Sequence, residues 1–236
     1  MRRTRTWWST ILATLLLGAS AGASAWGLFG AGLAFADGTR TFSAQEQKDL
    51  NAGRLVVRSE TRSVGDAHLV GGLAWQVIDA EVTQVWATLA DVTTYAGFLP
   101  AVSEAKRVAR LAHAERIFIR HRYSLVDASY YVLMSPDAAH GRLPFHLDHT
   151  QPSAISDAYG ELRVSPFGAG RSVVSFAIMV DVGDGLWAGL LRGEIHKWLL
   201  RVPEQLARYM TKQKRLGRTP GPRGPDTSCP DKALLK

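Results

Sequence analysis

The apolar residues of this chain change their spacing at Pro100. In the segment directly before it, from Val82, they recur at helical spacing, and beyond it at a period of about two, which is typical of β-strands. Six candidate strands follow, separated by short turn-like breaks: Val102–Leu111, Ala114–Leu125, Ala128–Ser135, Leu143–His149, Ile155–Pro166 and Ser172–Val182. Short breaks permit only hairpin connections, so this half of the chain predicts an antiparallel meander.

The residues before Pro100 predict two further strands and two short helices. The strand candidates are Arg54–Thr61 and His68–Ile78. The apolar residues of the first helix share one helical face, and these are Val82, Val85, Trp86 and Leu89. A second, shorter helix over Tyr95–Pro100 ends at its proline, because proline disfavours helical backbone at the preceding residue.

A long helix is predicted after the meander. Its apolar residues recur at spacings of three and four from Trp187 to Tyr209. Pro203 lies inside this run, and we expect it to kink the helix because proline removes a backbone hydrogen bond. An antiparallel sheet with one apolar face needs a cover, and a curved sheet around one long helix leaves a cavity wherever the two do not close fully.

The N-terminus has the pattern of a secretory signal. Arg2, Arg3 and Arg5 precede an uncharged, apolar run that extends to Ala36. Small-residue endings at Ala25 and Ala36 offer two cleavage sites. An uncleaved membrane anchor is the alternative, although the run is rich in Gly, Ala and Ser. We therefore expect an exported protein, periplasmic or secreted, or else one anchored in the membrane and facing away from the cytoplasm.

The net charge of +7 belongs to the two ends of the chain. The N-terminal arginines and the basic residues after Met210 account for it, which leaves residues 37–210 close to neutral. A nucleic-acid-binding domain would carry basic charge on its folded surface, so no nucleic-acid partner is expected. The tail could make weak contact with anionic membrane surfaces. The single cysteine, Cys229, excludes an internal disulfide.

These patterns divide the chain into four parts. Residues 1–36 are the signal peptide or anchor, and residues 37–53 are an extension with a short helix. We expect residues 54–210 to form the domain that encloses this cavity, a ligand-binding domain, and we expect it to be a monomer. Residues 211–236 are a basic tail rich in Pro and Gly, for which we expect disorder because it cannot bury apolar surface.

Three segments carry a family resemblance: Val77–Ala80 (VIDA), Val85–Asp91 (VWATLAD) and Tyr95–Pro100 (YAGFLP). The chain resembles the START-like, or SRPBCC, superfamily of helix-grip proteins, nearest to its coenzyme Q-binding and polyketide cyclase/dehydrase group. The resemblance covers about Arg54–Met210. It implies an α+β fold, with a curved antiparallel sheet of about seven strands wrapped around a long C-terminal helix and two short helices after the first core strand. Members share a pocket rather than a catalytic motif.

Alternation within Ala114–Leu125 selects candidate pocket residues. Ile117, Ile119, His121 and Tyr123 share the more apolar face, which should line the cavity. His121 and Tyr123 would then be polar groups that orient a ligand or act as an acid–base pair, or else half-buried structural side chains. Aromatic and apolar residues of other segments complete the candidate lining, namely Tyr131, Phe145, Phe176, Trp187, Leu191, Ile195 and Trp198.

The sequence leaves three functions open. The first is a non-catalytic carrier of a small hydrophobic molecule, such as a lipid, a quinone or a polyketide-like compound. The second is a polyketide cyclase/dehydratase that uses His121 and Tyr123, and export argues against it. The third is a structural protein with a filled interior. No cofactor and no metal are expected, because His146 and His149 would face opposite sides of a strand. Arg163 and Glu194 could form a buried ion pair or lie in solvent.

Overall fold

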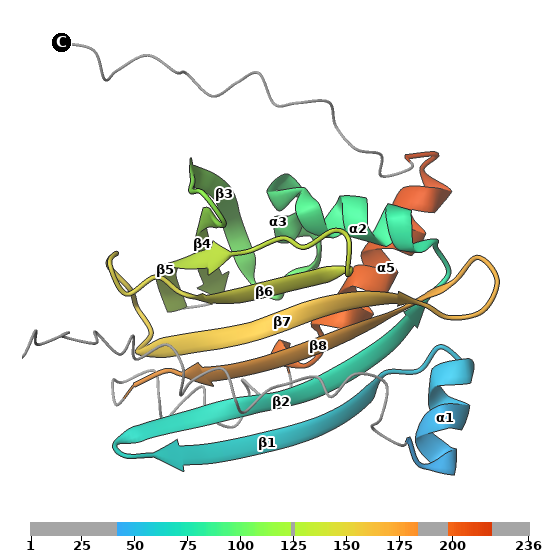
Figure 1. Ribbon diagram of the computed structural model, residues 1–236, viewed down its shortest axis with the longest axis horizontal. Coiled ribbons are helices and arrows are strands. Elements are labelled where there is room, and N and C mark those ends of the chain that lie inside the picture. Colours follow the sequence, from blue (N-terminus) through green and yellow to red (C-terminus); the bar gives the residue numbers. More distant parts are fainter. Residues whose placement is uncertain (1–41, 124–125, 184–197, 219–236) are drawn as a thin grey trace, which may run out of the picture. The chain divides into compact units, whose positions relative to one another are not determined.

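The computed structural model describes residues 42–123, 126–183 and 198–218. They contain an antiparallel sheet in the spatial order β1-β2-β8-β7-β6-β5-β4-β3 (Figure 1). The strands are β1 (Val56–Val64), β2 (Ala67–Ile78), β3 (Val102–Arg110), β4 (Glu115–Tyr123), β5 (Val126–Met134), β6 (Arg142–Leu147), β7 (Asp157–Pro166) and β8 (Ser172–Asp181). The predicted antiparallel α+β arrangement is confirmed.

The strand count is eight rather than the about seven that the family resemblance implied. β1, which the sequence predicted as a strand over Arg54–Thr61, forms one edge of the sheet. It pairs with β2 along its whole length, from Val56 opposite Trp75 to Val64 opposite Ala67. Alternating half-buried and exposed side chains allow β1 to occupy an edge without a fully buried face.

The meander from β3 to β8 pairs each strand with its successor, as the short breaks predicted. β8 then pairs with β2, from Val70 opposite Val180 to Ile78 opposite Ser172. This contact joins the N-terminal hairpin to the meander. β2 becomes an interior strand, and its residues from Leu69 to Ile78 are buried.

Short helices connect β2 to β3. α2 (Val82–Ala90) buries Val85 and Leu89 and packs against β7. A 3₁₀ turn, η2 (Val92–Thr94), follows, and the Asp91 carboxylate accepts a hydrogen bond from the Thr93 amide at its start. α3 (Tyr95–Phe98) then leads to Pro100. Before the sheet, α1 (Ala44–Asn51) carries a complete capping box at Ser43.

The last helix corrects one prediction. α5 (Val202–Arg215) begins immediately before Pro203, so the proline lies in a first turn rather than kinking a continuous helix. The first turn of a helix has amides without intrahelical partners, so proline costs no hydrogen bond there. Trp198 and Leu199 are helical and are separated from α5 by a turn at Leu200 and Arg201. The part of the predicted helix from 184 to 197 lies outside the described residues.

α5 packs against β2, β8 and α3, on the same side of the sheet as the short helices (Figure 1). It continues past Met210, where the sequence suggested the end of the domain, to Arg215. Buried residues of both the sheet and the helices form one hydrophobic cluster. None of the helices in the described part of the chain is both long and apolar enough to cross a membrane.

Candidate ligand cavity

A cavity of about 200 Å³ lies between the inner face of the sheet and the helical segments. α3 and the corner that follows it, strands β4 to β8 and the start of the last helix supply its wall. Most of the lining is apolar: Phe98, Leu99, Ala101, Ile119, Val132, Met134, Phe145, Ile155, Leu162, Phe176, Ile178, Val180, Leu199 and Val202. A concave apolar space with few polar groups is typical of small-molecule sites.

Strand alternation builds this wall. On β5 every second residue faces inward, so Ala128, Tyr130, Val132 and Met134 line the cavity. β4 adds Ile119 and His121 through its register with β5, in which Ile119 lies opposite Tyr130. The neighbouring residues Phe118 and Tyr131 face outward, with ring centroids 5.2 Å apart. A ligand would therefore touch only one of the two adjacent tyrosines.

His121 and Tyr130 form a hydrogen-bonded pair in the cavity wall. The Nε2 atom of His121 lies 2.8 Å from the Tyr130 hydroxyl oxygen, and the two rings are stacked with centroids 5.6 Å apart. The Nδ1 atom of His121 lies 3.0 Å from the carbonyl oxygen of Pro100. His121 is thus held at both ring nitrogens, between β5 and the corner before β3.

These partners determine where the protons lie. The Pro100 carbonyl can only accept, so Nδ1 of a neutral His121 carries the hydrogen and Nε2 is left with a lone pair. Tyr130 must then donate its hydroxyl hydrogen to Nε2. Burial lowers the pKa of His121, and the hydrogen bond to Pro100 only partly offsets this. Burial also raises the pKa of Tyr130, so both groups are neutral near pH 7.

The corner at Pro100 and Ala101 has a strained backbone and is hydrogen-bonded to β4. Ala101 has φ of 57°, in the left-handed region that favours glycine. The amide of Arg122 donates to the Ala101 carbonyl at 2.9 Å, next to the His121 contact with Pro100. Two bonds from consecutive residues of β4 therefore hold the strained corner against the cavity.

Tyr95 is a third polar group in the wall. Its hydroxyl donates to the carbonyl oxygen of Leu89 at 2.8 Å and lies 3.6 Å from the sulfur of Met134. The side chain is buried, and burial raises its pKa. Tyr95 thus links α3 to the end of α2 while presenting most of its ring to the core.

The predicted ligand-binding residues are distributed as follows. Five line the cavity together: Ile119, His121, Phe145, Phe176 and Trp198. Ile117 is buried in the adjacent core without lining the cavity, and Tyr131 lies on the opposite face of the sheet. The side chain of Tyr123 lies outside the described residues, as do Trp187, Leu191 and Ile195.

Tyr130, the partner of His121, is absent from the residues predicted from sequence, and Tyr131 was predicted instead. Alternation along β5, which works as it does along β4, places Tyr130 and not Tyr131 on the cavity side. The signal was present, because Ala128, Tyr130, Val132 and Met134 are on average more apolar than Asp127, Ser129, Tyr131 and Leu133. The corner residues Leu99 to Ala101 were missed because nothing in a short loop indicates which wall it will contact.

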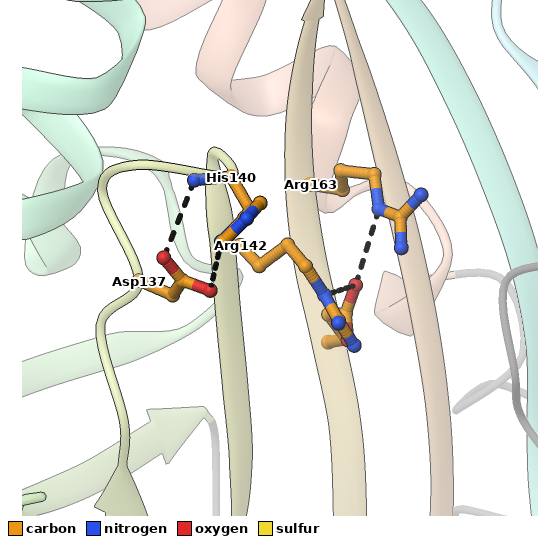
Figure 2. A network of polar contacts seen from close by, with 5 residues as sticks. Asp137, His140, Arg142 and Arg163 are labelled. Carbon is orange, nitrogen blue, oxygen red and sulfur yellow. Dashed lines mark hydrogen bonds and ion pairs between the residues drawn. The ribbon is translucent and has the colours of Figure 1, made fainter. Parts of the chain in front are cut away.

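The outer face of β6 and β7 carries charged residues instead. Glu161 accepts hydrogen bonds from Arg142 at 3.1 and 2.6 Å and from Arg163 at 3.3 Å. Figure 2 shows the two arginines side by side, with the Asp137–His140 pair of the preceding turn beside them. Arg163 therefore has Glu161 as a partner, whereas Glu194 lies outside the described residues.

No group of three or more potential metal ligands occurs among the described side chains. His149 pairs with Asp157 at 3.2 Å, and the pKa of half-buried His146 is lowered mainly by burial. The interior cavity is therefore the candidate site, and the His121–Tyr130 pair is its principal polar feature.

Comparison with known proteins gives a structural answer only. Scans against protein families and curated proteins find no match. Among solved structures, the protein TTHA0849 from Thermus thermophilus matches with a TM-score of 0.52 at 17% identity, over 61% of this chain and 97% of that one. Human STARD10 matches with a TM-score of 0.52 at 12% identity, over 75% of this chain and 83% of that one.

A STAR-related lipid transfer protein from Xanthomonas axonopodis matches with a TM-score of 0.50 at 10% identity, over 67% of this chain and 98% of that one. The fold is START-like. The resemblance inferred from the segments around Val77, Val85 and Tyr95 is thereby confirmed at the level of fold. The cavity of this START-like domain lies between the sheet and the helical cover, where the sequence placed it.

Proposed function

We propose that this START-like domain is a non-catalytic carrier that holds one small hydrophobic molecule in its cavity. The observation that carries the proposal is the apolar cavity with the hydrogen-bonded pair His121–Tyr130 in its wall. Removal of apolar ligand surface from water contributes about 2.5 kcal/mol per 100 Å². Affinity would therefore come from burial, and the polar pair would set the orientation of the ligand.

Export forms part of the proposal. It rests on the basic and apolar N-terminal sequence, and the basic tail after Met210 would suit contact with anionic membranes. A carrier outside the cytoplasm would move a poorly soluble compound between membranes or from a membrane to an acceptor. Fractionation of the native host tests export, because a cytoplasmic protein that retains residues 1–36 would contradict it.

An enzymatic function is the alternative, and the same pair favours it. A neutral imidazole hydrogen-bonded to a buried phenol could pass a proton to or from a bound substrate, as a cyclase or dehydratase requires. This alternative predicts that His121→Ala abolishes turnover in protein that remains folded. A carrier would instead keep binding its ligand and show no turnover at any stage.

Native mass spectrometry on protein purified from its own host is the most direct test of the carrier. A co-purifying hydrophobic molecule is expected in the wild type. Ala128→Leu should expel it, because Ala128 lines the cavity. Ser129→Leu is the matched control, since it adds the same side chain to the other face of β5 and should leave the ligand bound. A fully packed interior that takes up no hydrophobic probe would overturn the proposal.

A further inference from the structure

The hydrogen bonds of the cavity wall show which polarity a ligand must have. Three polar side chains of the sheet and α3 face the cavity, and each has its hydrogen committed to the protein. His121 donates from Nδ1 to Pro100, Tyr130 donates to Nε2 of His121, and Tyr95 donates to Leu89. Pro100 and Leu89 contribute carbonyl oxygens, which cannot donate, so these directions cannot reverse while His121 is neutral.

What the His121–Tyr130 pair offers a ligand in return is a lone pair. The Tyr130 oxygen, having given away its hydrogen, can still accept from a ligand. Trp198, a polar lining residue of the helical segment, has an interaction of its own. The described lining contains no Lys, Arg, Asp or Glu. Beside the Tyr130 oxygen, a ligand carbonyl or carboxylate would therefore lose its bonds to water without gaining a donor from Tyr130 or His121 or a cation from the described lining, which is costly in an apolar site.

The geometry points to a hydroxyl-bearing ligand. We infer that the cavity selects a neutral hydrophobic molecule whose hydroxyl group donates to the Tyr130 oxygen, over the same skeleton with a carbonyl in that place. This inference rests on the proposed carrier function and specifies its ligand class. Three hydrogen bonds would then run in one direction, from the ligand to Tyr130, to His121 and to Pro100. Aligned bonds of this kind polarise and strengthen one another.

Three bicyclic probes of nearly equal size separate the possibilities. Tetralin has no polar group, α-tetralone has a carbonyl that only accepts, and α-tetralol has a hydroxyl that can donate. Competition with an environment-sensitive fluorescent probe at pH 7.5 would give their dissociation constants for the full-length protein. Tetralol should bind roughly threefold to tenfold more tightly than tetralone, the range expected from one neutral hydrogen bond.

One substitution should invert this preference. His121→Leu removes the acceptor for the Tyr130 hydrogen, so the phenol can turn its O–H into the cavity and donate to a carbonyl. The ratio of affinities should then shift toward tetralone. The double variant His121→Leu/Tyr130→Phe should lose the distinction, because no polar group of the pair is left. Tyr131→Phe is the matched control, since Tyr131 lies on the other face of β5, and should bind as the wild type does.

The outcomes distinguish the inference from the function on which it rests. Failure of all three probes to bind would overturn the carrier itself. Binding of all three, with tetralone equal to or tighter than tetralol in the wild type, would overturn the inferred ligand class and leave the carrier standing. Because this second comparison uses only unmodified protein, it decides the matter even if His121→Leu does not fold.

Discussion

The ring of Tyr209 in α5 lies directly against Gly97 in α3, where an added Cβ would come within 2.5 Å of the Tyr209 Cε2 atom. Phe98 packs on the same tyrosine, with ring centroids 6.1 Å apart. Gly97→Ala should therefore lower the free energy of unfolding by about 1–3 kcal/mol through overpacking. Chemical denaturation of the variant and the wild type measures this.

The same contact offers its own control. Tyr209→Leu removes the ring atoms that the new methyl group would meet, so Gly97→Ala should cost much less in that background. Equal losses in the two backgrounds would show that α3 does not depend on close contact with the α5 ring.

Acid should weaken the fold through His121. Burial lowers its pKa below the ordinary value of 6.5, so the unfolded chain takes up the proton first as pH falls. Stability from this group is complete above pH 6.5 and declines as pH falls toward the lower folded pKa. His146 shifts in the same direction. Urea denaturation at pH 7 and pH 5 should show this loss.

A pair of histidine variants isolates the contribution of His121. His121→Gln should reduce the loss between pH 7 and pH 5, whereas His113→Gln, at an exposed turn, should not. Asp127 does not contribute to the change between pH 7 and pH 5, because hydrogen bonds from Arg120 hold its pKa at about 2. An unchanged pH dependence in His121→Gln would mean that the buried imidazole does not control acid stability.

Glu161 should stabilise the protein through its bonds to two arginines on the outer face of β6 and β7. Arg142 and Arg163 lie opposite each other in the sheet register, and Glu161 accepts from both. Glu161→Gln removes the carboxylate charge that the two arginines share, so we expect a loss of about 1–3 kcal/mol in the free energy of unfolding. High salt should reduce the loss by screening the arginines.

The control for this network is Glu104→Gln, which breaks an exposed pair with Lys106. Little or no change in stability is expected there. A loss at Glu161 that is the same in low and high salt would indicate lost hydrogen bonds rather than repulsion between the arginines.

Position 160 in β7 should not tolerate any side chain larger than that of glycine. An added Cβ would lie 2.6 Å from Cζ of Phe145 and 2.3 Å from the carbonyl oxygen of Ala177. Gly160→Ala should lower the free energy of unfolding by about 1–3 kcal/mol and weaken tetralin binding, because Phe145 lines the cavity and would be displaced. Denaturation and probe competition measure the two effects.

Replacing Phe145 by leucine tests how much of the loss comes from contact with its ring and how much from the backbone. In a Phe145→Leu background, Gly160→Ala should still lower the free energy of unfolding, although by less, since the contact with the Ala177 backbone remains. Full recovery would show that the sheet backbone adjusts freely at this position, contrary to the expectation for an interior strand.

Much of the fold could be predicted from local periodicity. The change at Pro100 predicted the meander, and the regular spacing after it located β3 to β8 because each strand alternates with solvent on one side. The last helix was predicted as continuous through Pro203, although it restarts at Val202. Proline is compatible with both arrangements, and only tertiary packing decides between a kink and a new first turn.

The site was harder to predict from the sequence than the fold. Alternation on β4 placed His121 in the wall, because one strand carries that information by itself. Its partner Tyr130 depends on the β4–β5 register, and its second bond depends on the backbone of Pro100, which no side-chain pattern reveals. A polar side chain in an apolar wall can be predicted from sequence more easily than the atoms with which it forms hydrogen bonds.

Ala101 carries a further consequence for redesign. Its methyl group forms part of the cavity wall, and its backbone adopts a left-handed conformation that glycine would accept more readily. In most proteins a substitution that enlarges an internal cavity lowers the free energy of unfolding. At this corner, replacement by glycine would widen the cavity and relax the backbone in one step, so position 101 is where the cavity could be enlarged with the least loss of stability.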